Sequence, residues 1–226
     1  MRRPSLLRTP TSPAAKLYAG TPVEAVKTPW RKAHYCVVDL ELSGLDPRND
    51  EIISFAAVPI DAGRDLAGST LYGLCRPTRP LPERSILIHG IRTVDLAEAP
   101  PLDEAIRPLI TAMAGRVLVV HVAWVERSFL GRAFARQGLR LREPVLDTCE
   151  LGQLLALTRQ QPPAPRALDE LARSLNLPVH QQHHALGDAL TTAQLFLALA
   201  TNLEEYIPET VQSLARASQR LSSYRG

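Results

Sequence analysis

The apolar stretch from Cys36 to Leu42 constrains the fold most, because two carboxylates interrupt it. The pattern predicts a β-strand that runs into a turn at Ser43-Gly44. Side chains alternate between the two faces of a strand, so Asp39 and Glu41 share one face. A strand this apolar is usually central in its sheet and covered on both sides.

Two acids on one face of a covered strand repel each other and resist desolvation unless a cation lies between them. A hard divalent cation, Mg²⁺ or Mn²⁺, is the simplest partner for such carboxylates. The alternative is that Asp39 and Glu41 lie at an exposed strand end.

The composition is that of a globular protein, with 45% hydrophobic and 22% charged residues in a chain of 226. This length favours one domain with tails. The three cysteines, Cys36, Cys75 and Cys149, are far apart and lack metal-site spacing, which predicts buried thiols in a reducing compartment. We therefore expect a cytoplasmic protein. No apolar run is long enough to span a bilayer, so no membrane partner is expected.

The charge is distributed unevenly along the chain. Residues 1–33 carry seven basic residues against Glu24 alone, a balance of +6, whereas the whole chain carries +3 and residues 34–226 therefore −3. The first segment is predicted to be a basic, proline-rich extension that is disordered or loosely packed, with a short helical turn near Pro22–Val26. Attraction to phosphates must then come from local arginines, a bound metal or this extension.

The remaining pattern predicts a domain over residues 34–202 and a C-terminal helical tail over 203–226. Two further strands, 51–60 and 70–76, form an antiparallel meander with the first, and an irregular connection follows over 77–100. Helices are then expected over 102–114, 125–137, 148–157, 168–175, 185–199 and 208–221, with buried strands at 117–120 and 145–147. The fold class is α/β: a mixed sheet, first antiparallel and then parallel, flanked by helices on both faces.

Two more acids are predicted in the first turns of helices. Glu126 shares a helix face with apolar residues three, four and seven positions on, so it points toward the sheet; the alternative is that it only caps the first turn. Asp188 repeats this pattern, and His183 lies five residues before it. A histidine beside a metal-bound acid can take a proton near neutral pH.

Together these residues resemble the DnaQ-like, DEDDh-type 3′–5′ exonucleases, a family that includes the proofreading epsilon subunit of bacterial replicative DNA polymerase. The resemblance covers about residues 34–202 and rests on four segments: Asp39-x-Glu41-x-x-Gly44-Leu45, Ile88-His89-Gly90-Ile91, His121-x-Ala123-x-x-Glu126-x-x-Phe129-Leu130 and His183-x-Ala185-x-x-Asp188-Ala189. The family has Asp where this chain has Glu126, a longer oxygen ligand that either binds the metal or weakens the site.

The resemblance implies a ribonuclease H-like fold and removal of nucleoside 5′-monophosphates from single-stranded DNA 3′ ends, in proofreading or repair. It implies two ions, Mg²⁺ or Mn²⁺, held by four carboxylates: Asp39, Glu41, Glu126 and Asp188. His183 would be the general base, since the family spacing selects it over His184. Leu45 and His89 would contact the terminal nucleotide, with loop packing as the alternative for both. A DNA polymerase subunit is a possible partner.

Three other functions fit part of this pattern. An RNA 3′-end trimming exonuclease would use the same residues, because nothing in the sequence reports a 2′-hydroxyl contact. A catalytically weak nucleic-acid- or partner-binding module would result if Glu126 impaired the site. A metal phosphatase would explain the acids but not the spacing of His183 and Asp188. His34 and His180 are expected at the surface.

Overall fold

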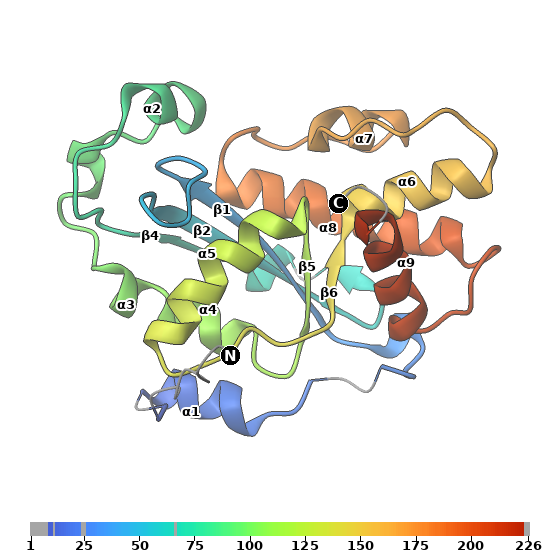
Figure 1. The fold of residues 1–226 in the computed structure, drawn as a ribbon, viewed down its shortest axis with the longest axis horizontal. Helices are drawn as coiled ribbons and strands as arrows, with labels where there is room; N and C mark the ends of the chain where they lie inside the picture. The colour runs from blue at the N-terminus through green and yellow to red at the C-terminus, as the bar shows by residue number, and fades with distance from the viewer. Residues whose placement is uncertain (1–8, 11, 24–25, 66, 224–226) are drawn as a thin grey trace.

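A mixed β-sheet forms the centre of the computed structural model, which describes residues 9–10, 12–23, 26–65 and 67–223 (Figure 1). Within the described residues the sheet runs in the order β3-β2-β1-β5-β6, and β4 also pairs with β2. Its strands are β1 (Tyr35–Leu42), β2 (Ile52–Asp61), β3 (Arg64–Asp65), β4 (Leu71–Leu74), β5 (Val117–Val120) and β6 (Val145–Asp147). The pairs β1–β2, β2–β3 and β2–β4 are antiparallel, and β1–β5 and β5–β6 are parallel. The predicted change from antiparallel to parallel pairing is confirmed.

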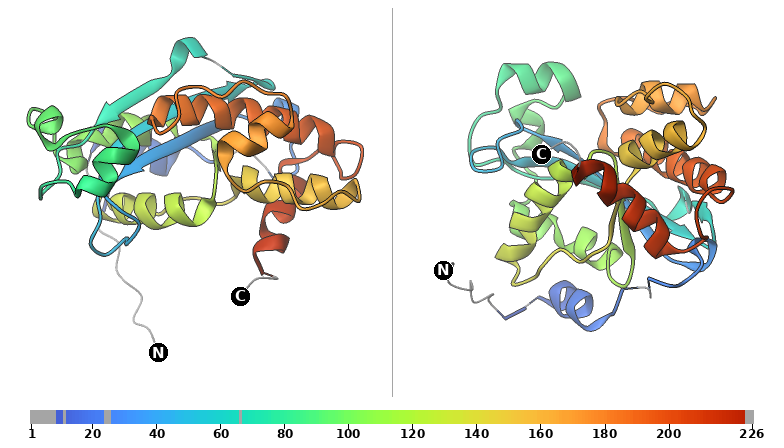
Figure 2. Two further views of the ribbon diagram at one scale, coloured as in Figure 1. Left: turned by 90° about the horizontal axis from the view of Figure 1, so that it is seen from above. Right: turned by 45° about the vertical axis from the view of Figure 1, so that its right-hand side comes forward.

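Helices cover both faces of the sheet, as predicted (Figure 2). One face packs against α6 (Thr148–Thr158), α7 (Leu168–Ser174), α8 (Ala185–Leu203) and α9 (Val211–Ser223). The other packs against α1 (Pro13–Gly20), α4 (Arg107–Ala112) and α5 (Ala123–Arg136). The central strand β1 contributes to both cores: Val37 lies in the first, and Cys36, Val38 and Leu40 lie in the second. Asp39 and Glu41 follow Val37 at two-residue intervals, so they belong to the face that α8 covers.

The helix predicted over 102–114 is divided into α3 (Leu102–Ala105) and α4, with Ile106 between them. Pro108 explains the interruption. Proline has no amide hydrogen, and its ring clashes with the carbonyl four residues earlier in a continuous helix. In the second position of a new helix, where Pro108 lies, both costs disappear.

The prediction of an irregular connection over 77–100 is wrong, because the segment contains α2 (Glu83–His89) and the 3₁₀ helix η3 (Thr93–Leu96). A small separate core anchors it, in which Leu81, Ile86 and Leu96 pack against Ile53. Gly90 ends α2 in the left-handed conformation, with φ of 73°.

The prediction of disorder or loose packing for residues 1–33 is wrong for the residues described. Helix α1 begins after Ser12, whose side chain accepts a hydrogen bond from the Ala15 amide. Tyr18 is buried and packs edge-on against Phe134 of α5, with ring centroids 5.1 Å apart. The basic, proline-rich composition of residues 1–33 did not indicate that Tyr18 would pack against the rest of the domain. The helical turn predicted near Pro22–Val26 falls partly on residues 24–25, which lie outside the described residues.

The two terminal segments also stabilise each other. Trp30 is fully buried, its Nε1 donates to Glu204 Oε1 at 2.8 Å, and its amide donates to the Glu209 carbonyl at 3.1 Å. The Val211 amide, at the start of α9, donates to the Thr28 carbonyl at 3.1 Å. These contacts join the two segments that were predicted to lie outside the domain over 34–202, and the division itself stays a prediction.

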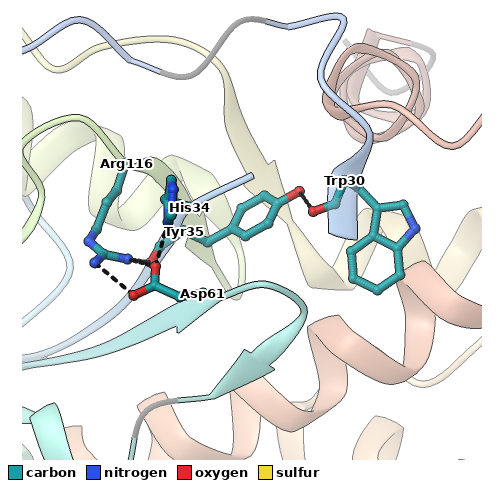
Figure 3. A network of polar contacts seen from close by, with 5 residues as sticks. All are labelled: Trp30, His34, Tyr35, Asp61 and Arg116. Atoms are coloured by element: carbon teal, nitrogen blue, oxygen red, sulfur yellow. Dashed lines mark hydrogen bonds and ion pairs between the residues drawn. The ribbon is translucent and has the colours of Figure 1, made fainter. Parts of the chain in front are cut away.

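A polar network joins this region to the sheet (Figure 3). The Tyr35 hydroxyl donates to the Trp30 carbonyl at 2.8 Å. On β2, Asp61 binds Arg116 Nη2 at 3.1 Å and His34 Nδ1 at 2.7 Å. His34 is exposed, as predicted.

Cys36, Cys75 and Cys149 are all buried, as predicted. Burial raises the pKa of Cys36 and of Cys75 to about 12, so both thiols keep their protons at neutral pH. None of the helices in the described part of the chain is long and apolar enough to cross a membrane.

Candidate active site

The two strand acids lie at the carboxyl end of β1. Asp39 is opposite Ala56 of β2, and Glu41 is opposite Ser54. Asp39 is half-buried and Glu41 is only 8% exposed. The register shifts between Glu41 and Leu42, where β1 leaves the sheet. A rigid strand therefore fixes the separation of the two carboxylates up to the point where the turn begins.

Asp188 joins them from the first turn of α8. Carboxylate oxygens of Asp39, Glu41 and Asp188 all lie within 4.8 Å of one another. Three converging carboxylates form an all-oxygen donor set, which is the kind that Mg²⁺ and Mn²⁺ prefer. The structure thus brings together three of the four predicted metal ligands.

The electrostatics of this group favour a bound cation. Burial raises the pKa of Asp39 well above its usual range, and the charges of Glu126, Asp188 and Glu41 raise it further. Burial and the charge of Asp188 raise the pKa of Glu41 to about 7. Burial also raises the pKa of Asp188, against the opposing effect of a hydrogen bond from the His183 amide. The carboxylates cannot all ionise at neutral pH without a positive partner, which a divalent cation would supply.

Glu126 lies apart from this group of three. It is 3% exposed, and its Oε2 has no hydrogen-bond partner among the described residues. Burial raises the pKa of Glu126 well above its usual range, a hydrogen bond from its own backbone opposes this, and the charge of Asp147 adds to it. Because its charge also raises the pKa of Asp39, Glu126 lies within electrostatic range of the group. The inward orientation predicted for Glu126 is confirmed, whereas its role as a ligand stays a prediction.

The start of α5 is set by Asp147, a residue that sequence reasoning missed. Asp147 accepts hydrogen bonds from the amides of Val122 at 3.1 Å, Ala123 at 2.8 Å and Cys149 at 2.9 Å. It thereby caps α6 and holds the turn that precedes α5. In that turn Val122 has φ of 67°, a left-handed conformation that is rare for a β-branched residue. An aspartate at the end of a short buried strand and directly before a helix was the available signal, since this is a common helix-capping position.

His183 and His184 lie in the loop that leads into α8. The His183 amide donates to Asp188 Oδ2 at 2.9 Å, and the exposed His183 side chain lies within electrostatic range of Asp188. The His184 ring instead stacks on Tyr72, with centroids 4.8 Å apart. His180 is half-buried and its Nε2 is fully covered, so the prediction of a surface residue is wrong there: the loop folds back onto α8.

A cavity of about 580 Å³ adjoins the strand acids. The predicted substrate residues Leu45 and His89 both line it, together with Glu41, Arg84 and Ile88. Leu45 is 61% exposed at the tip of the turn after β1, so loop packing does not account for its side chain. A second cavity, of about 630 Å³, lies beside β4, and no predicted site residue lines it.

The protonation of His89 follows from its contacts. The Ile91 amide donates to His89 Nδ1 at 3.0 Å, so Nδ1 is the acceptor and Nε2 carries the hydrogen of the neutral ring. Burial lowers the pKa of His89, which favours this neutral form. His89 Nε2 is buried without a hydrogen-bond partner in the described part of the chain. His89 therefore offers an unused donor at a cavity beside the acids.

Solved structures share this fold. Exonuclease X in complex with 5′ overhanging duplex DNA superimposes with a TM-score of 0.62 and 21% identity, covering 81% of this chain and 99% of that one. Exonuclease I of E. coli in complex with a dT13 oligonucleotide has a TM-score of 0.68 and 14% identity, covering 77% of this chain and 42% of that one. The predicted ribonuclease H-like fold is confirmed.

Sequence relatives identify the family. A DNA polymerase III subunit epsilon-like protein of Rhodobacter capsulatus is 36% identical over 181 residues, which are 79% of this chain and 25% of that protein. A PolC-type DNA polymerase III of Thermotoga petrophila is 32% identical over 170 residues, 74% of this chain and 12% of that protein. The chain thus spans a quarter or less of the length of these relatives. The exonuclease family model of the RNase T type matches residues 36–196, and the chain belongs to this DnaQ-like exonuclease family.

Proposed function

We propose that the protein is a metal-dependent 3′–5′ exonuclease that removes nucleoside 5′-monophosphates from single-stranded DNA ends. The observation that carries this proposal is the convergence of Asp39, Glu41 and Asp188 within 4.8 Å, beside a cavity of about 580 Å³. The acids supply a metal site, and the cavity supplies space for a terminal nucleotide.

Each residue then has a role in hydrolysis of the last phosphodiester. Asp39, Glu41 and Asp188 would hold divalent cations, and Glu126 would complete the ligand set from α5. Two such cations, Mg²⁺ or Mn²⁺, would lower the pKa of the attacking water and stabilise charge on the leaving oxygen. His183 takes the proton of the attacking water as general base. The bond between phosphorus and the 3′ oxygen breaks, and that oxygen gains a proton as the nucleoside 5′-monophosphate departs.

The cavity fits the end of a single strand. Leu45 offers an exposed apolar side chain for the terminal base, and His89 Nε2 offers a hydrogen bond at the cavity wall. A strand end requires no groove reading, so stacking and metal contact replace a large basic surface. This is consistent with the charge of −3 over residues 34–226.

Cleavage of oligonucleotides tests the proposal. With Mg²⁺ or Mn²⁺, single-stranded DNA labelled at its 5′ end should shorten one nucleotide at a time, and DNA labelled at its 3′ end should release labelled mononucleotide from the start. Asp39→Asn should abolish both reactions, whereas Asp103→Asn, at a carboxylate that binds Arg136, should retain them. Internal cleavage products, or full activity in Asp39→Asn, would contradict the proposal.

Trimming of RNA 3′ ends is the second candidate activity. A similar fold occurs in a 3′-exonuclease that recognises the histone mRNA stem-loop at its 3′ end, with a TM-score of 0.59 and 17% identity. The same assay with an RNA strand of matched sequence decides between the sugars: a higher kcat/KM on RNA than on DNA would reverse our assignment.

A weakly catalytic binding module is the alternative that the position of Glu126 favours, because its carboxylate lies outside the group of three. Glu126→Asp and Glu126→Ala separate the two possibilities. If Glu126 is a working ligand, Glu126→Ala should lower the rate severely and Glu126→Asp should keep or raise it. An inert wild type that Glu126→Asp activates would favour the binding module.

We also propose that the protein acts in the cytoplasm with a DNA polymerase. The names of its relatives, an epsilon-like subunit and PolC-type polymerases, support this partner. Co-elution with a DNA polymerase III catalytic subunit in size-exclusion chromatography is the expected result, and separate elution at micromolar concentrations would argue against the partnership.

A further inference from the structure

The loop that carries His183 is fixed to α8 along its backbone. The His180 amide donates to Thr191 Oγ1 at 3.0 Å, and the His183 amide donates to Asp188 Oδ2 at 2.9 Å. Gly187 lies directly beneath Gln181: a Cβ at this glycine would be 2.0 Å from the Gln181 carbonyl oxygen. These contacts hold the backbone of the loop, but none of them involves the His183 ring.

The His183 residue itself is poorly restrained. It has φ of 56°, a left-handed conformation that strains a non-glycine residue. Its side chain is exposed, and its ring makes no hydrogen bond within the described part of the chain. An additional restraint on the loop is therefore needed if the imidazole is to stay beside the carboxylates.

His184 provides a lateral contact of this kind. Its ring stacks on Tyr72 with centroids 4.8 Å apart and an angle of 17° between the planes. His184 immediately follows His183 and occupies the residue directly before α8, without a side-chain hydrogen bond to the helix. The stack therefore connects the loop to β4, an element that belongs to the sheet.

Tyr72 lies on the same face of the sheet as the strand acids. The register places Tyr72 opposite Ala56 and Ala56 opposite Asp39, so the three residues form one row across β4, β2 and β1. Side chains in such a row point to the same face. Ala56, which separates them in this row, is fully buried in the core that α8 covers.

The electrostatics agree with this placement. Burial raises the pKa of Tyr72, the nearby Ser54 hydroxyl lowers it, and the charge of Glu41 raises it. Ser54 Oγ has no hydrogen-bond partner among the described residues. The Ser54 hydroxyl therefore lies near the Tyr72 phenol without forming a hydrogen bond to it. Tyr72 thus extends from its stack with His184 toward the strand acids.

We propose that Tyr72 is a positioning residue, which holds His183 beside the carboxylates by stacking on His184. This role rests on the proposed function, in which His183 accepts a proton from water. Tyr72 touches neither the reacting water nor the scissile phosphate in this account; it acts through the loop. The stacked pair restrains the loop from the side of the sheet, where the backbone contacts with α8 do not reach.

Kinetics of matched variants test the role. Tyr72→Leu keeps an apolar side chain but removes the stack, and Tyr72→Phe keeps the stack. We expect Tyr72→Leu to lower kcat about five- to tenfold, the size expected for loss of one aromatic pair, with KM and the Mn²⁺-induced rise in Tm unchanged. Tyr72→Phe should keep kcat within twofold. Unchanged kcat in Tyr72→Leu, or an equal loss in Tyr72→Phe, would overturn the proposal.

The His183→Ala background separates positioning from a general structural effect. If Tyr72 acts only through His183, then adding Tyr72→Leu to His183→Ala should cause no further loss of kcat. An additional five- to tenfold loss in the double variant would mean that Tyr72 acts by another route.

Amide hydrogen exchange gives a readout that does not depend on nuclease activity. Tyr72→Leu should speed exchange of the His183 amide, while amides in the middle of α8 keep their wild-type rates. Faster exchange in an enzyme without nuclease activity would support the restraint and refute only the proposed function. An unchanged His183 amide would refute the restraint itself.

Discussion

Glu41→Gln should stabilise the metal-free protein at alkaline pH while it abolishes cleavage. Glu41 is 8% exposed, and burial together with the charge of Asp188 raises its pKa from 4.5 to about 7. The folded protein therefore keeps a proton that the unfolded chain loses between pH 4.5 and pH 7. Stability is fully present below pH 4.5, falls as the pH rises through this window, and stays lower above about pH 7.

The magnitude follows from that pKa. A rise from 4.5 to about 7 corresponds to about 3 kcal/mol of lost stability at pH 8. For a protein of this size, this is a change in Tm of roughly 6–10 °C. Gln has the shape of Glu without its charge, so the variant should lack this part of the pH dependence.

Thermal melts in EDTA at pH 4.5 and pH 8 measure the effect. Subtracting the change in Tm caused by the substitution at pH 4.5 from that at pH 8 removes the packing cost of the amide, which is the same at both values. The control is Glu98→Gln, at an exposed carboxylate away from the site, and it should leave the pH dependence of Tm unchanged. If wild type and Glu41→Gln have the same pH dependence, then Glu41 does not lie in the repulsive environment described above.

Three further perturbations have defined outcomes. His183→Ala should lower kcat by a factor of about 10² to 10⁴, while the Mn²⁺-induced rise in Tm is retained. A larger loss of kcat in His184→Ala would show that His184 is the general base. Val122→Asn should raise Tm by about 2–4 °C, because asparagine tolerates the left-handed conformation at φ of 67° and relieves about 1 kcal/mol of strain. A lower Tm would mean that packing of the Val122 side chain stabilises the protein by more than the backbone strain destabilises it. Hydrogen bonds from Arg116 and His34 lower the pKa of Asp61, so its contribution to stability is present above pH 3.8 and is lost as the pH falls through the lower folded value. Asp61→Asn should thus lower Tm less at pH 2 than at pH 7, and an equal effect at both values would refute the charge-based explanation.

The parts of the fold that local periodicity determines could be predicted from the sequence. The alternation along β1 separated the acids from Cys36, Val38 and Leu40, and the two faces pack against different helices as that alternation requires. Asp188 could be placed in the first turn of a helix because it shares a helix face with Thr192, Leu195 and Phe196. These relations depend on neighbours within a few residues.

Features that depend on distant contacts could not be predicted. Tyr18 and Trp30 are buried by partners more than 100 residues away in the chain, Phe134 and Glu204. The local composition of residues 1–33 contains no sign of those partners. The row from Tyr72 to Asp39 likewise depends on strand register, which hydrophobic pattern alone leaves undetermined.

The position of Glu126 falls between these cases. The helix face of Glu126 was predicted. The direction of its carboxylate depends on the turn at Val122, which the hydrogen bonds from the Val122 and Ala123 amides to Asp147 hold in place. A side chain one methylene longer than Asp also has more rotamers, and in this structure it folds toward its own backbone. Glu126→Ala and Glu126→Asp therefore test its part in metal binding.

Calorimetric titration with Mn²⁺ tests the central claim, that Asp39, Glu41 and Asp188 form a divalent-metal site. Wild type should show saturable binding, and Asp39→Asn should lose it, because the variant removes one of three carboxylates that lie within 4.8 Å of one another. Asp103→Asn should bind as wild type does. Equal Mn²⁺ binding by wild type and Asp39→Asn, or no binding by wild type, would contradict the account.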